Sequence, residues 1–79
     1  MKLKIKAFGI TKDIMGGREV VVETYGQTVA ELRRDLNSKY PSLLSLKSLL
    51  IAVNNSYAEE QWTLKETDEI ALIPPVSGG

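Results

Sequence analysis

The stretch that decides the fold is residues 69–79, EIALIPPVSGG, in which an apolar run leads into two prolines and ends in two glycines. Residues 69–73 are typical of a buried strand. Proline fixes φ and has no N–H to donate, so Pro74 and Pro75 should end this strand and direct the last four residues away from the fold. Those four residues would extend over about 13 Å, which is enough to enter a pocket in a partner.

Gly78 and Gly79 form a tip without side chains, and we expect it to end in the free carboxylate of Gly79. Because glycine has no Cβ, this tip can pass through a slot that excludes any larger residue. The carboxylate is ionised at neutral pH, and it can attack an activated phosphate to become an acyl group. A cloning linker is the alternative, but it does not explain the strand and the two prolines before the glycines. The tail is therefore the predicted place of the chemistry.

The composition excludes several functions. Seventy-nine residues allow one domain with a small core, so a stabilising partner is expected. The ten basic and ten acidic residues balance, and no run of lysine or arginine could follow a phosphate backbone, so nucleic acid is not expected as a partner. The sequence has no cysteine and no histidine, which removes thiolate metal sites and the usual general base. We therefore expect no metal, no bound cofactor and no catalysis by this chain alone.

The first strand is predicted at residues 2–8, where lysines alternate with Leu3, Ile5 and Ala7. Two interpretations of the lysine row are open: a solvated strand face, which we favour, or a surface that binds an acidic partner. The alternation also interrupts any signal-peptide core, and no stretch has the length of a membrane span, so a cytosolic protein without a membrane partner is expected.

A second strand is predicted at residues 20–24, after a loop in which the glycine pair at 16–17 makes a turn with positive φ. Thr28 and Glu31 then match a capping box that begins a helix, which ends before Pro41. Within this helix the apolar residues recur on one face, at Val29, Leu32 and Leu36.

The remainder of the chain is predicted to complete a sheet. Residues 42–49 are expected to form a loop with room for a short helical turn, and residues 50–53 a strand that ends in the turn Asn54-Asn55-Ser56. Tyr57 begins a short return strand, and Trp62 and Leu64 are expected to fold over the core. The predicted fold class is α+β: a single domain, residues 1–79, with one main helix on a mixed sheet of four to five strands and a flexible tail at residues 76–79.

Four apolar residues are expected close to the tail, and each could complete the core or form a docking surface. We assign Leu72 to the core and Val76, which lies beyond the last strand, to docking. Phe8 and Ile73 make up the candidate docking patch.

The order of elements, residues 50–54, the turn at residues 68–70 and above all the ending PPVSGG resemble the small sulfur-carrier subunit of molybdopterin synthase, a ubiquitin-like β-grasp family. The resemblance covers essentially the whole chain. Two departures are Thr67, where the family usually has glycine, and Leu72 and Ile73, where members often carry aromatic residues.

The resemblance implies a cycle at Gly79. An activating enzyme related to those that activate ubiquitin would use ATP to form a C-terminal glycyl adenylate, and a sulfur donor enzyme would convert it into a thiocarboxylate (1-thioglycine). The tail, with Pro74, Pro75, Val76, Ser77 and Gly78, would then enter the large synthase subunit in a two-plus-two heterotetramer. Sulfur would pass to cyclic pyranopterin monophosphate, and two transfers would build the molybdopterin dithiolene.

Three alternatives remain open. The same tip would serve a sulfur carrier for the thiazole of thiamine or for a thiolated tRNA base. It would also serve a protein modifier that joins Gly79 to lysines of target proteins. The third alternative is a binding module whose tail is inert.

Overall fold

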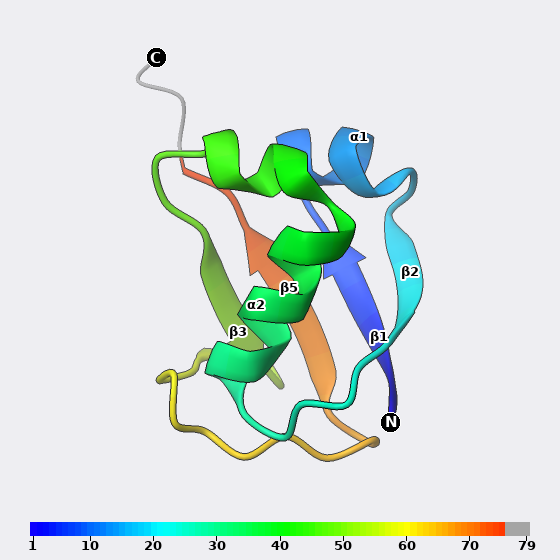
Figure 1. The fold of residues 1–79 in the computed structure, drawn as a ribbon, viewed down its shortest axis with the longest axis vertical. Coiled ribbons are helices and arrows are strands. Elements are labelled where there is room, and N and C mark those ends of the chain that lie inside the picture. The colour runs from blue at the N-terminus through cyan, green and yellow to red at the C-terminus, as the bar shows by residue number, and fades with distance from the viewer. Residues whose placement is uncertain (76–79) are drawn as a thin grey trace.

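A computed structural model describes residues 1–75 of the chain (Figure 1). The elements in chain order are β1 (Lys2–Ala7), α1 (Ile10–Met15), β2 (Glu19–Glu23), α2 (Val29–Lys39), the 3₁₀ helix η1 (Pro41–Ser45), β3 (Leu50–Val53), β4 (Ser56–Tyr57) and β5 (Glu69–Ile73). The tail predicted at residues 76–79 lies outside the described residues.

Five strands form one mixed sheet in the order β2-β1-β5-β3-β4. The middle strand, β5, runs parallel to β1 and antiparallel to β3, with Ile5 beside Ile70 and Ile51 beside Leu72. The two other pairings, β1 with β2 and β3 with β4, are antiparallel. The predicted short return strand and mixed sheet are therefore confirmed, and the predicted strand boundaries lie within one residue of those observed.

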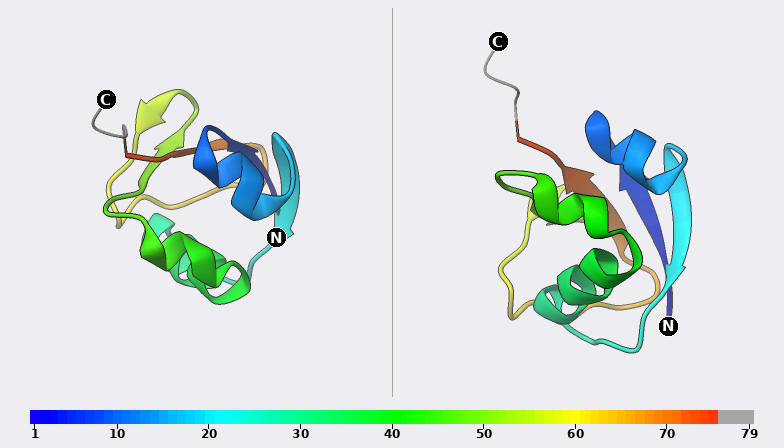
Figure 2. Two further views of the ribbon diagram at one scale, coloured as in Figure 1. Left: turned by 90° about the horizontal axis from the view of Figure 1, so that it is seen from above. Right: turned by 45° about the horizontal axis from the view of Figure 1, so that its top comes forward.

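The sheet buries one face only. Leu3, Ile5 and Ala7 of β1 are buried, whereas Lys2 and Lys4 are exposed, as the alternation in the sequence predicted. Helix α2 lies across this buried face in both views of Figure 2. Its residues Val29, Leu32 and Leu36 are completely buried, so the apolar stripe predicted for this helix forms the other half of the core.

The predicted capping box begins α2. The backbone N–H of Glu31 donates to Oγ1 of Thr28 over 3.2 Å, and Oε1 of Glu31 accepts from the N–H of Thr28 over 3.2 Å and from that of Gln27 over 3.0 Å. These N–H groups, that of Gln27 first, hold the pKa of the Glu31 carboxyl below its usual value, because they stabilise its charged form. In the first turn of the helix, the N–H of Glu31 is therefore satisfied by a side chain, and those of Val29 and Ala30 donate to the backbone carbonyls of Trp62 and Glu60.

The prediction of a loop between β1 and β2 was wrong, because residues 10–15 form helix α1. Gly16, at φ +86°, ends this helix in the left-handed conformation, and its N–H donates to the carbonyl of Lys12 over 3.0 Å. The side chain of Thr11 is buried and accepts a hydrogen bond of 2.8 Å from the N–H of Phe8. Positive φ was predicted for the turn at the glycine pair 16–17; it is found at Gly16 and not at Gly17, and Gly16 ends a helix instead of lying in a loop.

In the second half of the chain, the burial of Trp62 differs from the prediction. Asn54 and Asn55 adopt φ of 51° and 70°, as expected for the tight turn after β3. Leu64 is buried as predicted, but Trp62 is 53% exposed. The carbonyl of Trp62 accepts the N–H of Val29 over 3.0 Å, so this loop contacts the start of α2 through its backbone while the Trp62 side chain is largely exposed.

Candidate functional site

The candidate site begins where the middle strand of the sheet ends. Strand β5 ends at Ile73, so the prolines do come directly after the last strand, and both Pro74 and Pro75 are half-buried. A rigid sheet therefore holds the base of the tail on both sides. The remaining predicted tail residues lie outside the described residues, and their roles stay predictions; they are Val76, Ser77, Gly78 and Gly79.

The turn after β1 touches the base of the tail. Because β1 and β5 are parallel, both strands end at the same edge of the sheet, which is the upper edge in Figure 1. Gly9 adopts φ +56°, and a Cβ atom at this position would lie 3.2 Å from Cγ of Pro74. Both the backbone conformation and the close approach favour glycine here. Gly9 and Pro74 thus bring two distant parts of the sequence into contact beside the tail.

The two residues predicted as a docking patch come together. Phe8, which is 48% exposed, and the half-buried Ile73 line one shallow hollow of 290 Å³ on the open face of the sheet. With them lie Ala52, Ala71 and Tyr57, and we call these five residues the apolar patch. Leu72 points the other way and is completely buried, as predicted for a core residue. Whether the apolar patch docks a partner remains a prediction.

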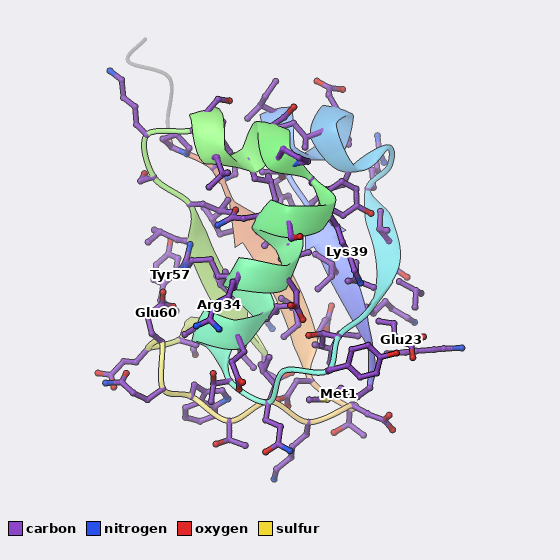
Figure 3. All side chains as sticks on the ribbon, in the orientation of Figure 1. Met1, Glu23, Arg34, Lys39, Tyr57 and Glu60 are labelled. Atoms are coloured by element: carbon purple, nitrogen blue, oxygen red, sulfur yellow. The ribbon has the colours of Figure 1, made fainter. Side chains whose placement is uncertain are left out.

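Sequence reasoning missed the part of the apolar patch that β3 and β4 contribute. In the sheet register, Ala52 lies between Ala71 on one side and Tyr57 on the other. The side chain of Tyr57, labelled in Figure 3, is 70% exposed. The alternation along β5 indicated that Ala71 shares a face with Ile73, but only the strand order shows that Tyr57 lies near them.

Charged residues cover the other half of the open face. Lys6 forms an ion pair with Glu69, and Nζ of Lys4 lies 3.7 Å from Oε1 of Glu19. The hydrogen bond from Lys6 lowers the pKa of Glu69, and in return Glu69 raises the pKa of Lys6. Two of the three lysines in the row thus pair with acids of their own sheet, which favours the interpretation as a solvated strand face.

Two findings on residues 1–75 concern metal ligands and membrane-spanning helices. Within residues 1–75, acidic side chains nowhere gather in the groups of three or more that could hold a metal ion. The helices of this same segment are all too short or too polar to cross a bilayer. The candidate site thus consists of three parts: the base of the tail, the apolar patch, and the charged side chains beside the patch.

Comparisons with known proteins agree with this geometry. The model of the ThiS family matches residues 5–79. The molybdopterin synthase sulfur carrier subunit of Caenorhabditis briggsae is 39% identical over 83 aligned residues, which cover 100% of this chain and 99% of that protein.

Two solved structures share the fold. Small archaeal modifier protein 1 from Methanosarcina acetivorans superposes with a TM-score of 0.80 at 27% identity, covering 99% of this chain and 96% of that one. A chain from the complex of subunits 1 and 2 of the molybdopterin-converting factor from Helicobacter pylori gives a TM-score of 0.68 at 28% identity, with both chains fully covered. The fold is the predicted ubiquitin-like β-grasp. The chain belongs to the ThiS family and is a homologue of the molybdopterin synthase sulfur carrier subunits.

Proposed function

We propose that this chain is the sulfur carrier subunit of molybdopterin synthase. The observation that supports it most is the placement of Pro74 and Pro75 at the end of the middle strand, in a chain similar to such a subunit over its whole length. A rigid sheet edge is a suitable mount for a thin tail, because the tail can enter a partner without any rearrangement of the domain.

In the proposed activation, a carboxylate oxygen of Gly79 attacks the α-phosphate of ATP in the activating enzyme, and pyrophosphate leaves. The product is a mixed anhydride, in which AMP has become a good leaving group. Hydrosulfide supplied by the sulfur donor then attacks the carbonyl carbon, loses its proton and displaces AMP, which leaves a thiocarboxylate at Gly79. This chain contributes the reacting carboxylate and a tip thin enough to reach both active sites.

In the proposed transfer, the tail enters the large synthase subunit and the thiocarboxylate sulfur attacks the cyclic pyranopterin monophosphate. A C–S bond forms at a carbon of the pterin side chain while a C–O bond at that carbon breaks, and its oxygen leaves with a proton. Water then hydrolyses the resulting thioester between Gly79 and this sulfur, which leaves the sulfur on the pterin and restores the carboxylate of Gly79. We infer that the carrier acts as a cosubstrate and that the large subunit supplies the acid, the base and the substrate site. The expected assembly is two small and two large subunits, in the cytosol.

An intact-mass measurement tests the carrier function. The chain would be incubated with ATP, the activating enzyme and a sulfur source, with a variant that lacks Gly79 as control. We expect a shift equal to one oxygen replaced by sulfur, located on the C-terminal peptide, and no shift in the control. An unchanged mass with an activating enzyme that modifies another carrier would overturn the proposal.

A second candidate function is protein modification, because a protein named as a small archaeal modifier shares this fold at 27% identity. Such a modifier would join Gly79 to a lysine of a target through an isopeptide bond. Mass spectrometry of trypsin-digested cell extract distinguishes the two functions, since a carrier leaves a thiocarboxylate and a modifier leaves its C-terminal peptide, residues 66–79, joined to target lysines.

A further inference from the structure

A basic hollow lies on the other side of the tail base from the apolar patch. It has a volume of 440 Å³ and is formed where β1 ends, α1 begins and the chain enters β2. Three cationic side chains, Lys6, Lys12 and Arg18, line it together with the carboxylate of Glu19. Because Lys6 already pairs with Glu69, the charge available to a ligand comes from Lys12 and Arg18. Within residues 1–75, neither of these two side chains forms an ion pair or a side-chain hydrogen bond.

The basic hollow adjoins the tail. Gly9, which also lines the hollow, is the residue whose Cβ would lie 3.2 Å from Pro74. Phe8 lines both the basic hollow and the hollow of the apolar patch. A protein that receives the tail and covers Phe8 therefore also meets Lys12 and Arg18.

The charges of the chain are distributed unevenly along the molecule. The loop at residues 58–68, at the end opposite the tail in Figure 1, contains four acidic residues and one lysine. The segment at residues 8–18, at the tail end, contains two basic residues and one acidic residue. A chain with a formal net charge of zero thus has a positive end, from which the tail leaves, and a negative end. In the field of an acidic surface, such a molecule turns its tail end toward that surface.

We propose that the basic hollow receives acidic side chains at the rim of the activating enzyme and that Lys12 and Arg18 accelerate the encounter. This inference rests on the proposed function. Exposed charges at the edge of an interface change the association rate more than the affinity. Such charges therefore have the largest effect on a partner that binds and dissociates in every cycle, and this partner is the activating enzyme. A long-lived complex with the large subunit depends mainly on the buried apolar contacts of the apolar patch.

Protein carboxylates fit the basic hollow better than a nucleotide phosphate does. A tail that reaches into a slot carries the phosphate of its adenylate about 13 Å away from Pro75. The basic hollow, in contrast, adjoins Pro74 itself through Gly9. When the tail is inserted, Lys12 and Arg18 therefore face side chains on the surface of the activating enzyme, around the entrance of the slot that receives the tail.

The test compares two double charge reversals, Lys12→Glu with Arg18→Glu, and Arg34→Glu with Lys65→Glu. Both pairs change the net charge equally, but Arg34 lies on the lower half of α2 (Figure 3) and Lys65 in the loop at the negative end. For each chain, kcat/KM for ATP–pyrophosphate exchange by the activating enzyme would be measured from about 0.05 M to about 1 M salt. Circular dichroism and urea unfolding would check that both variants are folded, and Lys12→Gln with Arg18→Gln repeats the test without new acidic groups.

At low salt we expect kcat/KM of the Lys12/Arg18 variant to fall about tenfold with kcat unchanged, because steering acts on encounter. The loss should shrink to less than about twofold at 1 M salt, where the Debye length is about 3 Å. The control reversal should change kcat/KM by less than about twofold, and binding of the large subunit should change as little in either variant.

Equal rates for the two double variants, or a loss that salt does not reduce, would overturn the inference while leaving the carrier function intact. A larger effect on large-subunit binding than on activation would also overturn it. If the unaltered chain formed no adenylate at all, the proposed function itself would fail, and this inference with it.

Discussion

The two faces of β5 differ although they alternate within five residues. Ile70 and Leu72 point into the core and are completely buried, whereas Ala71 and Ile73 belong to the open face and are half-buried. The inward residues pack against α2 and hold the middle of the sheet in place. The outward residues take part in the apolar patch beside the tail. Because side chains alternate between the two faces of this strand, one face contributes to folding and the other to the apolar patch. Substitutions on the inward face should reduce stability, and substitutions on the outward face should reduce binding.

The largest effect is expected for Leu72→Ala, which leaves a cavity in the core. Such truncations of buried leucine cost about 2–5 kcal/mol. A domain of this size has about 3–5 kcal/mol available from its core. We therefore expect a large fraction of the variant to be unfolded at 25 °C, as measured by urea unfolding followed by circular dichroism. A loss below about 1 kcal/mol would contradict the role of this face.

The next largest effect concerns the helix that covers the buried face. A Cβ atom at Gly26 would lie 2.4 Å from Cβ of Glu31, so Gly26→Ala must displace the start of α2 and its capping box. We expect a loss of about 1–3 kcal/mol in the free energy of unfolding. Gly17→Ala is the matched control, because its nearest neighbour, the carbonyl oxygen of Glu19, would be 3.9 Å away. Equal stabilities for the two variants would show that the approach of Gly26 to Glu31 is not restrictive.

A change on the open face should separate binding from folding. We expect Ile73→Ser to weaken binding of the large subunit by about tenfold, since apolar side chains near the centre of an interface carry much of its energy. The free energy of unfolding should fall by less than about 1 kcal/mol. Titration calorimetry with the large subunit, beside urea unfolding of the same variant, gives both numbers. Unchanged binding would remove Ile73 from the docking surface.

The smallest effect is expected for the ion pair of Lys6 with Glu69, whose side chains are 43% and 45% exposed. The lowered pKa of Glu69 means that its contribution to stability is present at neutral pH and is lost as pH falls through the pKa in the folded state. The raised pKa of Lys6 means that the contribution of the lysine is lost at the alkaline end, as pH rises through its folded-state pKa. Glu69→Gln should therefore be slightly less stable than the unaltered chain at pH 7.

The two unfolding curves should converge at acidic pH, below the lowered folded-state pKa of Glu69, where the carboxyl is protonated, and also in 1 M salt. Thermal unfolding over a pH series measures the difference. A gap that persists at low pH would assign the effect to packing of the side chain and not to its charge.

Local patterns in the sequence were sufficient to predict most of this fold. The run from Glu69 to Ile73 follows a turn at Asp68 and precedes two prolines. These boundaries predicted β5 with its observed bounds. Thr28 and Glu31 predicted the start of α2, because a capping box requires only residues three apart. Thr67 replaces a glycine that is usual in the family, and it needs no positive φ: within residues 1–75, only Asn54 and Asn55 combine a side chain with positive φ.

The misses have physical reasons. Helix α1 is too short to show a clear period, and it depends on a buried Thr11 and on two glycines with positive φ at its ends. Trp62 was expected over the core because tryptophan is buried on average, but in this fold the loop meets the start of α2 through the backbone of Trp62 and the side chain is exposed. The basic hollow joins the end of β1, helix α1 and the start of β2, so it was missed together with α1, the helix that connects the two strands.

The position of β5 also constrains how the protein is made. The middle strand of the sheet is the last element of the described chain, so a ribosome delivers it after the helix and all the other strands. Until then the hairpin of β1 and β2 and the pair of β3 and β4 lack the strand that joins them, and their edges are open to other chains. A translation product that stops before residue 69 consequently has two unconnected half-sheets, and it should be a substrate for cellular proteases.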